Sequence, residues 1–202
     1  MRKYITEFIG TFFLVLIIAM TGVPIVIGSV LMVMVFAGGH ISGAHYNPAV
    51  TLAVLLRGRI SISDAIPYMI VQIGGAILAA LIARWLLGNP EMASLNLEGK
   101  TIRALGAEII GTFGLAFVVL NVATAKATAN NSFYGLAIGF TVYAMAEAFG
   151  KISGGAFNPA VAIGMSFMKI FEWSNIWVYL AGCFGGAAMA AILFRTLNPD
   201  DK

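Results

Sequence analysis

The sequence predicts an all-α membrane protein in which six transmembrane helices and two re-entrant half-helices form an inverted 3+3 repeat. Three observations support this prediction: a shortage of charged residues, six long apolar stretches, and one polar phrase that occurs twice. Of the 202 residues, 60% are hydrophobic and 10% are charged, whereas soluble domains carry about 25% charged residues. Most of the chain must therefore face lipid or other apolar helices. The net charge of +3 is too small and too scattered to indicate a nucleic-acid partner.

The six apolar stretches are close to the length of a membrane-spanning helix, which is about 17–25 residues. The first two are joined through Gly22 and Pro24, which predict a tight turn and an almost absent loop. The basic start followed by an apolar core also resembles a signal peptide. However, EFIGTF near the start returns later as EIIGTF, which favours mature structure for both copies. The stretches run over about 5–21, 24–39, 66–87, 104–122, 133–149 and 173–194.

The chain is expected to be one domain built from two repeats, about 1–100 and 101–202. A glutamate precedes the NPA triplet in each repeat, by 40 residues in the first and by 50 in the second, and a GGA segment follows each triplet in matching register. Three spans in each repeat is an odd number, so the second copy enters the membrane from the opposite face. Inverted repeats place their functional sites near the bilayer midplane, where the halves meet.

The repeated phrase reads HISGAHYNPAV at 40–50 and KISGGAFNPAV at 151–161. In both copies Asn is a favourable N-cap, and Pro is favoured at the first helical position. The apolar run after each Asn has about ten residues, too few to span a membrane. Each phrase therefore predicts a short helix that starts at the midplane. Irregular backbone at that depth is tolerated only where it is buried in protein or lines a watery cavity. A single NPA would be read more simply as a turn and cap.

The positions of the basic residues weakly favour cytoplasmic N- and C-termini. With that orientation seven cations lie inside, namely Arg2, Lys3, Arg57, Arg59, Lys126, Arg195 and Lys202, and five lie outside, namely Arg84, Lys100, Arg103, Lys151 and Lys169. We therefore expect a multi-pass protein of the cell (inner or plasma) membrane.

With both phrases in place, the whole chain resembles the aquaporin (major intrinsic protein) family. The resemblance rests on GHISGAHYNPAVT at 39–51, on the second NPA, and on the E-x-x-G-T opening of both repeats. It implies a homotetramer in a lipid bilayer, with one pore per subunit that passively conducts water or small uncharged solutes. It implies no cofactor. The two NPA triplets are Asn47, Pro48, Ala49 and Asn158, Pro159, Ala160.

The chemistry of the phrase residues agrees with that mechanism. The Asn47 and Asn158 amides would donate to a passing oxygen and so interrupt a proton wire, and the half-helix dipoles would repel cations. Backbone carbonyls before each triplet would form acceptor ladders to the midplane, from Gly43, Ala44, His45 and Tyr46 and from Gly154, Gly155, Ala156 and Phe157.

The resemblance also indicates where selectivity is set. The family usually has Arg directly after the second NPA, and here that position is Val161. The other three constriction positions, carried over by their offsets, are Ile27, Ala146 and Gly155. This set has no charge, no side-chain donor and no large aromatic ring. It predicts a wider, more apolar constriction that passes glycerol-size polyols or undissociated metalloid acids as well as water.

Two carboxylates lie within the spans, which by default marks them as functional. By family resemblance Glu7 and Glu108 brace the two loops, a role favoured over a proton relay. Gln72 is expected to brace the first loop, while Cys183 holds the equivalent place as a plain core residue. His45 is expected to fix loop geometry, with gating as the alternative.

Glu147 lies four residues before Lys151, which predicts an ion pair on one helix face near the outer vestibule, with a solute contact by Glu147 as the alternative. No His, Cys, Asp or Glu cluster has metal-ligand spacing, and no nucleophile stands beside a base. A passive channel that excludes ions and protons is therefore the preferred function. A strict water channel, a proton-coupled secondary transporter and a non-conducting membrane protein are alternatives, and an enzyme is disfavoured.

Overall fold

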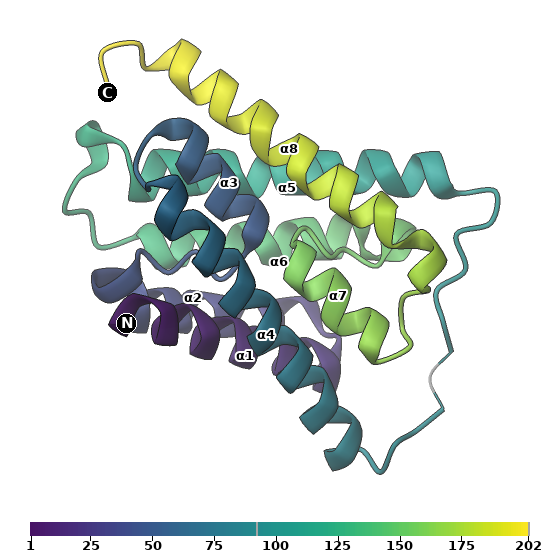
Figure 1. Ribbon diagram of the computed structural model, residues 1–202. Helices are drawn as coiled ribbons and strands as arrows, with labels where there is room; N and C mark the ends of the chain where they lie inside the picture. Colours follow the sequence, from purple (N-terminus) through teal and green to yellow (C-terminus); the bar gives the residue numbers. More distant parts are fainter. Residues whose placement is uncertain (92, 202) are drawn as a thin grey trace.

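Two short helices run toward each other inside a frame of six long ones (Figure 1). The structure is a computed structural model that describes residues 1–91 and 93–201. Within these residues the six-plus-two prediction is confirmed. The long helices are α1 (Arg2–Thr21), α2 (Pro24–Ser42), α4 (Ile62–Leu86), α5 (Thr101–Ala123), α6 (Tyr134–Ser153) and α8 (Ile176–Leu197), and the short ones are α3 (Pro48–Arg57) and α7 (Pro159–Phe167).

Five of the long helices are apolar and long enough to cross a membrane by length and composition alone, and α6 is not among them. The second half of α6 carries Glu147 and Lys151, which lower its hydropathy. Large apolar side chains are exposed on the outer surface of the bundle, as lipid contact requires; examples are Ile70 and Ile192, which are 63% and 66% exposed. In the described part of the chain the only β pairing is an isolated bridge between Leu95 and Phe171.

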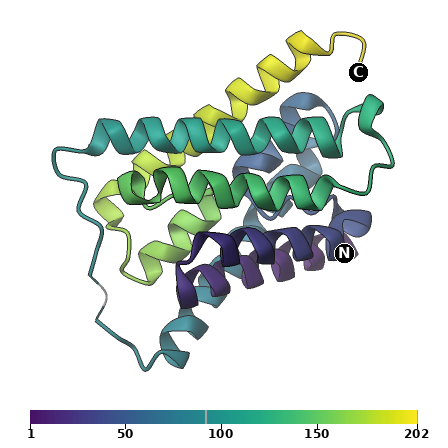
Figure 2. The same ribbon diagram turned by 180° about the vertical axis from the view of Figure 1, so that it is seen from behind.

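The two repeats superimpose in sequence with an offset of 111 residues from α2 onward, as Asn47 and Asn158 show. Helix α1 packs on α4 in the first repeat, and α5 packs on α8 in the second. Helices α2 and α6 cross between the repeats, and each short helix packs on the other repeat, α3 against α8 and α7 against α4. Both chain ends lie at one end of the bundle, and the α4–α5 connection lies at the other (Figures 1 and 2).

The connection between α1 and α2 is the expected tight turn. Helix α1 ends at Gly22, whose φ of 63° is the left-handed conformation that favours glycine. Its N–H donates to the Ile18 carbonyl over 3.0 Å. Only Val23 then separates Gly22 from Pro24, the first residue of α2. The loop is therefore almost absent, which accounts for the ten-residue difference between the repeats.

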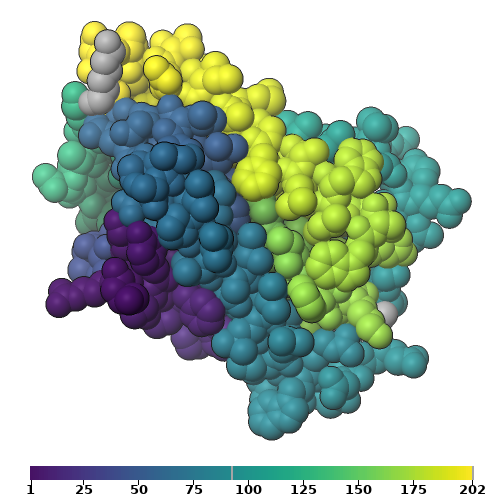
Figure 3. Space-filling model, in the orientation of Figure 1, coloured from purple at the N-terminus to yellow at the C-terminus, as the bar shows by residue number. Residues whose placement is uncertain are grey.

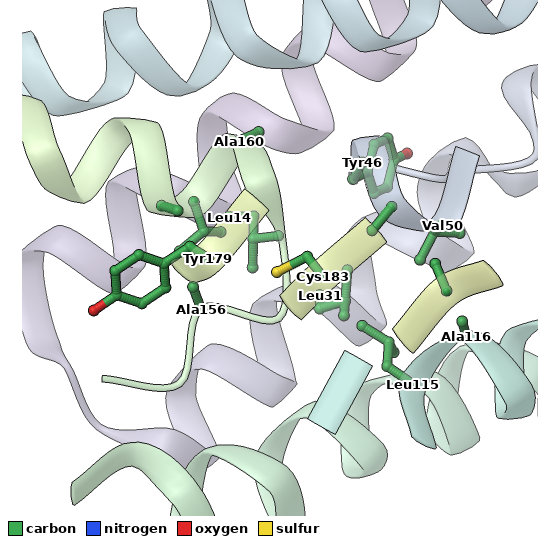
Figure 4. Packing of buried hydrophobic residues seen from close by; sticks show 14 of the residues in the cluster. Leu14, Leu31, Tyr46, Val50, Leu115, Ala116, Ala156, Ala160, Tyr179 and Cys183 are labelled. Atoms are coloured by element: carbon green, nitrogen blue, oxygen red, sulfur yellow. The ribbon is translucent and has the colours of Figure 1, made fainter. Parts of the chain in front are cut away.

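Small side chains allow the helices to pack closely around the centre. Figure 4 shows Ala116, Ala156 and Ala160 among the larger Leu14 and Leu115. On the face seen in Figure 3, α8, α7 and α4 lie against one another. With little hydrophobic driving force between helices in lipid, such close backbone approach supplies the packing energy.

The closest approach between the repeats is the crossing of α2 and α6. A Cβ added to Gly28 would lie 2.5 Å from the Gly139 carbonyl oxygen, and a Cβ on Gly139 would meet the Gly28 oxygen at the same distance. Real Cβ atoms do not come this close to backbone. The two glycines therefore fix the distance between the halves.

We expect Gly139→Ala to destabilise the protein by about 1–3 kcal/mol, because backbone must move to relieve the overlap. The measurement is thermal or denaturant unfolding of the purified protein in detergent. Gly106→Ala is the matched control, since a Cβ there has no neighbour within 4 Å. Equal stability of the two variants would contradict the proposed tight crossing.

Candidate functional site

Each short helix starts at an asparagine that caps it. The Asn47 Oδ1 accepts the Ala49 N–H over 2.8 Å and the Val50 N–H over 3.4 Å. The Asn158 Oδ1 accepts the corresponding two N–H groups of α7 over 2.9 and 3.5 Å. Pro48 and Pro159 occupy the first helical turn, where a missing N–H costs nothing. Both side-chain oxygens are thereby fixed, and both amide nitrogens face the opposite repeat.

The two asparagines join the repeats by reciprocal hydrogen bonds. The Asn47 Nδ2 donates to the Phe157 carbonyl and the Asn158 Nδ2 donates to the Tyr46 carbonyl, each over 2.9 Å. The side-chain amide nitrogen of asparagine carries two hydrogens, so each asparagine keeps one N–H beyond this bond. The capping bond and the cross-repeat bond together leave little rotational freedom in either side chain.

Glu7 binds the first loop from behind. Its Oε1 accepts the Ser42 hydroxyl over 2.6 Å and the His45 N–H over 3.0 Å. Its Oε2 accepts the Tyr46 N–H over 2.7 Å and the Gln72 side-chain amide over 2.8 Å. The glutamate is fully buried, and four donors satisfy its two oxygens. This arrangement is what a buried carboxylate requires.

Glu108 repeats this arrangement in the second half. Its Oε1 accepts the Ser153 hydroxyl over 2.6 Å and the Ala156 N–H over 3.0 Å. Its Oε2 accepts the Phe157 N–H over 2.7 Å, and the fourth donor is the Cys183 thiol at 3.5 Å. A thiol is a weak donor. Cys183 is a buried core residue, as expected, and its sulfur in addition contacts the carboxylate.

The first repeat has an additional polar layer that the second lacks. Gln72 donates to the Thr51 hydroxyl over 3.1 Å as well as to Glu7, and that hydroxyl lies 3.0 Å from the Asn47 carbonyl. The His45 Nδ1 lies 3.1 Å from the same hydroxyl. Either atom can be the donor in this contact, because the role of the ring nitrogen depends on the imidazole tautomer. At the equivalent positions the second repeat has Ala156, Ala162 and Cys183.

The loops need this support because their backbone is strained. Tyr46 and Phe157, the residues before the two asparagines, have φ values of 51° and 47°. Non-glycine residues in this left-handed region cost about 1–3 kcal/mol each and persist only where the surroundings fix them. Here each strained residue donates its N–H to a buried carboxylate and its carbonyl accepts an asparagine amide.

Sequence reasoning missed two pairs of supporting residues. Ser42 and Ser153 donate to the two glutamates, and Tyr68 and Tyr179 donate to the carbonyls of these serines over 2.8 and 2.7 Å. The signal was present in the sequence. Each serine stands in the repeated ISG, and each tyrosine lies 21 residues after the NPA asparagine.

A cavity of about 690 Å³ runs past both asparagines. It is lined by the loop residues before each asparagine and by apolar side chains of the long helices such as Leu31, Leu115 and Ile138. Among the residues expected to supply carbonyls, Gly43 is not part of this lining, because it is the C-cap of α2 and donates to Gly39. The loop residues in the lining are Ala44, His45, Tyr46, Gly154, Gly155, Ala156 and Phe157.

All four residues expected at the constriction line this cavity. Ile27 and Val161 are 9% and 4% exposed, and Ala146 and Gly155 lie in the same lining. Glu7, Glu108 and Gln72 do not line it, which places both buried carboxylates behind the loops. A segment that sequence reasoning did not consider, residues 93–95, also lines the cavity, and the Leu95 N–H ties it to the Ile170 carbonyl over 2.8 Å.

Glu147 and Lys151 both line the cavity and are exposed. The expected ion pair between them is wrong: the ion pairs found among the described residues are Lys3–Asp64, Arg57–Asp201 and Arg59–Asp201. Exposed pairs on one helix gain little free energy and cost side-chain entropy, which explains why the two side chains remain apart. Among residues 1–91 and 93–201, no group of three or more His, Cys, Asp or Glu is placed so that it could hold a metal ion.

These features define a multi-pass membrane protein of two inverted repeats, with two half-helices that meet beside one cavity. The chain belongs to the major intrinsic protein family, whose model matches residues 1–194. It is 36% identical to aquaporin NIP1-1 of Zea mays, and the matched region covers all of this chain and 76% of the relative. It is 35% identical to glycerol uptake facilitator protein-like 6 of Lactiplantibacillus plantarum, with full coverage of both chains.

Nodulin-26 of Glycine max is 34% identical over the whole of this chain and 80% of its own. Among solved structures, the aquaglyceroporin from Plasmodium falciparum shares the fold with a TM-score of 0.83, at 23% identity and with 98% and 97% of the two chains covered.

We expect Glu7→Gln and Glu108→Gln each to lower the free energy of unfolding by about 2 kcal/mol or more. An amide in either place turns one acceptor oxygen into a donor that faces other donors, and hydrogen bonds to charged groups contribute about 1.5–3 kcal/mol each. Thermal unfolding in detergent measures the loss, and Glu147→Gln, at an exposed carboxylate, serves as the control. A variant with unchanged stability but an altered pH dependence of flux would instead support a proton relay.

Proposed function

We propose that this chain is a passive channel for water and small uncharged solutes. The observation that carries the proposal is one cavity lined by both NPA asparagines, by seven loop residues including Gly155, and by the three other uncharged residues expected at the constriction. The names of the relatives, which include aquaporins and a glycerol uptake facilitator-like protein, support the same function. We further propose a homotetramer in the cell membrane with cytoplasmic N- and C-termini.

Exclusion of ions follows from the balance of hydration. A charged solute loses far more free energy on dehydration than a few carbonyl and amide groups return. The positive ends of the α3 and α7 dipoles point toward the same place and add a barrier to cations. A neutral polyol or an undissociated acid loses much less, and it can exchange its water contacts for the loop carbonyls and for apolar contacts.

A proton-coupled transporter is not favoured. Coupling would need a carboxylate that titrates beside the substrate. The oxygens of Glu7 and Glu108 accept hydrogen bonds from the loops and from neighbouring side chains, and neither residue lines the cavity. Glu147 does line the cavity, but it is an exposed residue and is not buried beside the two asparagines. Their role in this proposal is to hold the loops in place.

Val161 is the residue on which the proposed solute range depends. We expect Val161→Arg to reduce glycerol permeation by about tenfold, equal to about 1.4 kcal/mol of added barrier, with a much smaller effect on water. A guanidinium adds a fixed charge, five donors and side-chain volume to the constriction. Stopped-flow light scattering of proteoliposomes measures both rates.

Val161→Leu is the matched control, because it adds volume without charge. If the Arg variant leaves the ranking of solutes unchanged, or if the wild type already excludes glycerol and small metalloid acids, Val161 is not part of the selectivity constriction.

We also expect a proton leak far slower than water flux, although no cation stands at the constriction. Each asparagine retains one N–H to orient a passing water, so that this water cannot accept a proton from its neighbour. A pH-sensitive dye inside the vesicles reports the leak after a pH step. Proton flux at a rate comparable with water flux would overturn this assignment of the two asparagines.

A further inference from the structure

The segment that follows α8 inserts one carboxylate into a basic recess at the end of α3. The Asp201 Oδ1 lies 2.7 Å from the Arg57 Nη2 and 3.2 Å from the Arg59 Nη2. The backbone N–H of Lys126 donates to the Asp201 Oδ2 over 2.8 Å. Donors from the α3–α4 and α5–α6 connections thus converge on both oxygens of a single carboxylate.

The centre of this recess is a buried guanidinium. The Arg57 side chain is only 2% exposed, and it stacks on the Phe194 ring with 4.7 Å between the guanidinium carbon and the ring centroid. Its Nη2 also reaches the Thr124 carbonyl at 3.5 Å. Its Nε is buried and has no hydrogen-bond partner. A buried charge with a free donor is costly unless an anion compensates it, so the recess has unused capacity for an acceptor.

Positive charge exceeds negative charge around the recess. Arg195 donates to the Leu56 carbonyl over 3.4 Å, which places a third guanidinium against the backbone of the residue before Arg57. Asp201 is the acid that pairs with Arg57 and Arg59 in the described part of the chain. The backbone N–H of Lys126, followed by the Arg57 guanidinium, holds the pKa of Asp201 below its ordinary value, so the carboxylate is ionised at neutral pH. It supplies one negative charge to the two guanidinium groups with which it pairs.

The fold does not require a cation at this place. The residue equivalent to Arg57 in the second repeat is Met168, which is also fully buried and carries no charge. Nor does the Asp201 main chain bond to the recess. Its own N–H donates to Asn198, which caps α8. Among the described residues, the Asp201 carboxylate makes the hydrogen bonds that tie residues 198–201 to the two connections.

We propose that Arg57, Arg59 and the Lys126 backbone N–H form a binding site for a phosphate group, and that Asp201 is its internal occupant. A dianionic phosphate monoester or inorganic phosphate brings more charge and more acceptor oxygens than a carboxylate, and guanidinium groups bind it in bidentate fashion. A tethered carboxylate competes at an effective concentration in the millimolar range. The wild-type chain therefore binds phosphate weakly, and displacement of residues 198–201 uncovers the site.

The test is calorimetric titration of the purified full chain in detergent with inorganic phosphate, at constant ionic strength set with chloride. Asp201→Ala is expected to tighten the apparent phosphate affinity about tenfold or more, because the internal competitor is gone. Asp200→Ala is the matched control at an exposed neighbour and is expected to behave as the wild type. Adding Arg59→Gln to Asp201→Ala is expected to abolish the gain, and it leaves the buried Arg57 in place.

A second arm distinguishes the source of the phosphate group. Vesicles of phosphatidylcholine with and without phosphatidic acid report binding of a lipid headgroup, whereas the detergent titration reports free phosphate. Tightening in either arm for Asp201→Ala supports the site and identifies its source. The proposal is overturned if Asp201→Ala binds no better than Asp200→Ala in both arms, or if the Arg59→Gln double variant binds equally well. These outcomes are independent of solute flux through the cavity.

Discussion

A buried carboxylate in each repeat makes the rest of this structure possible. Non-helical backbone at membrane depth exposes N–H groups that lipid cannot satisfy. Glu7 and Glu108 accept two such N–H groups each, together with a serine hydroxyl. This arrangement lets Tyr46 keep a strained left-handed conformation, and it leaves the loop carbonyls free to line a cavity. Without the carboxylates the buried N–H groups of the two loops would lose their hydrogen-bond acceptors.

The asparagines then connect the two braced loops into one unit. Each asparagine caps its own half-helix and donates to the loop of the other repeat, so the halves are held where the two half-helices meet as well as at the Gly28–Gly139 crossing. The two braces are not equal. The first is completed by the amide of Gln72, and the second by the weaker thiol of Cys183. The second repeat also contains three of the four residues expected at the constriction, namely Ala146, Gly155 and Val161.

The features that occur in both repeats could be predicted from the sequence. The helices, the half-helix starts and the order of glutamate and NPA follow from local periodicity, capping and register. What it could not supply were contacts between distant segments that have no counterpart in the other repeat. Arg57 and Asp201 are 144 residues apart, and residues 93–95 reach the cavity through a connection without a periodic pattern. The expected Glu147–Lys151 pair failed for a different reason, since helical spacing brings two side chains within reach but does not compensate the entropy cost of fixing them.

An uncharged constriction beside two fixed asparagines is proposed to pass small neutral solutes and to exclude ions. This proposal is tested most directly by one set of permeability measurements on wild-type proteoliposomes with water, glycerol, urea and boric acid at a pH where the acid is undissociated, together with ion conductance. The account predicts that water and at least one of the larger neutral solutes cross well above the rate of protein-free vesicles, with no ion conductance. Permeation of water alone, or a measurable ion current, would contradict it.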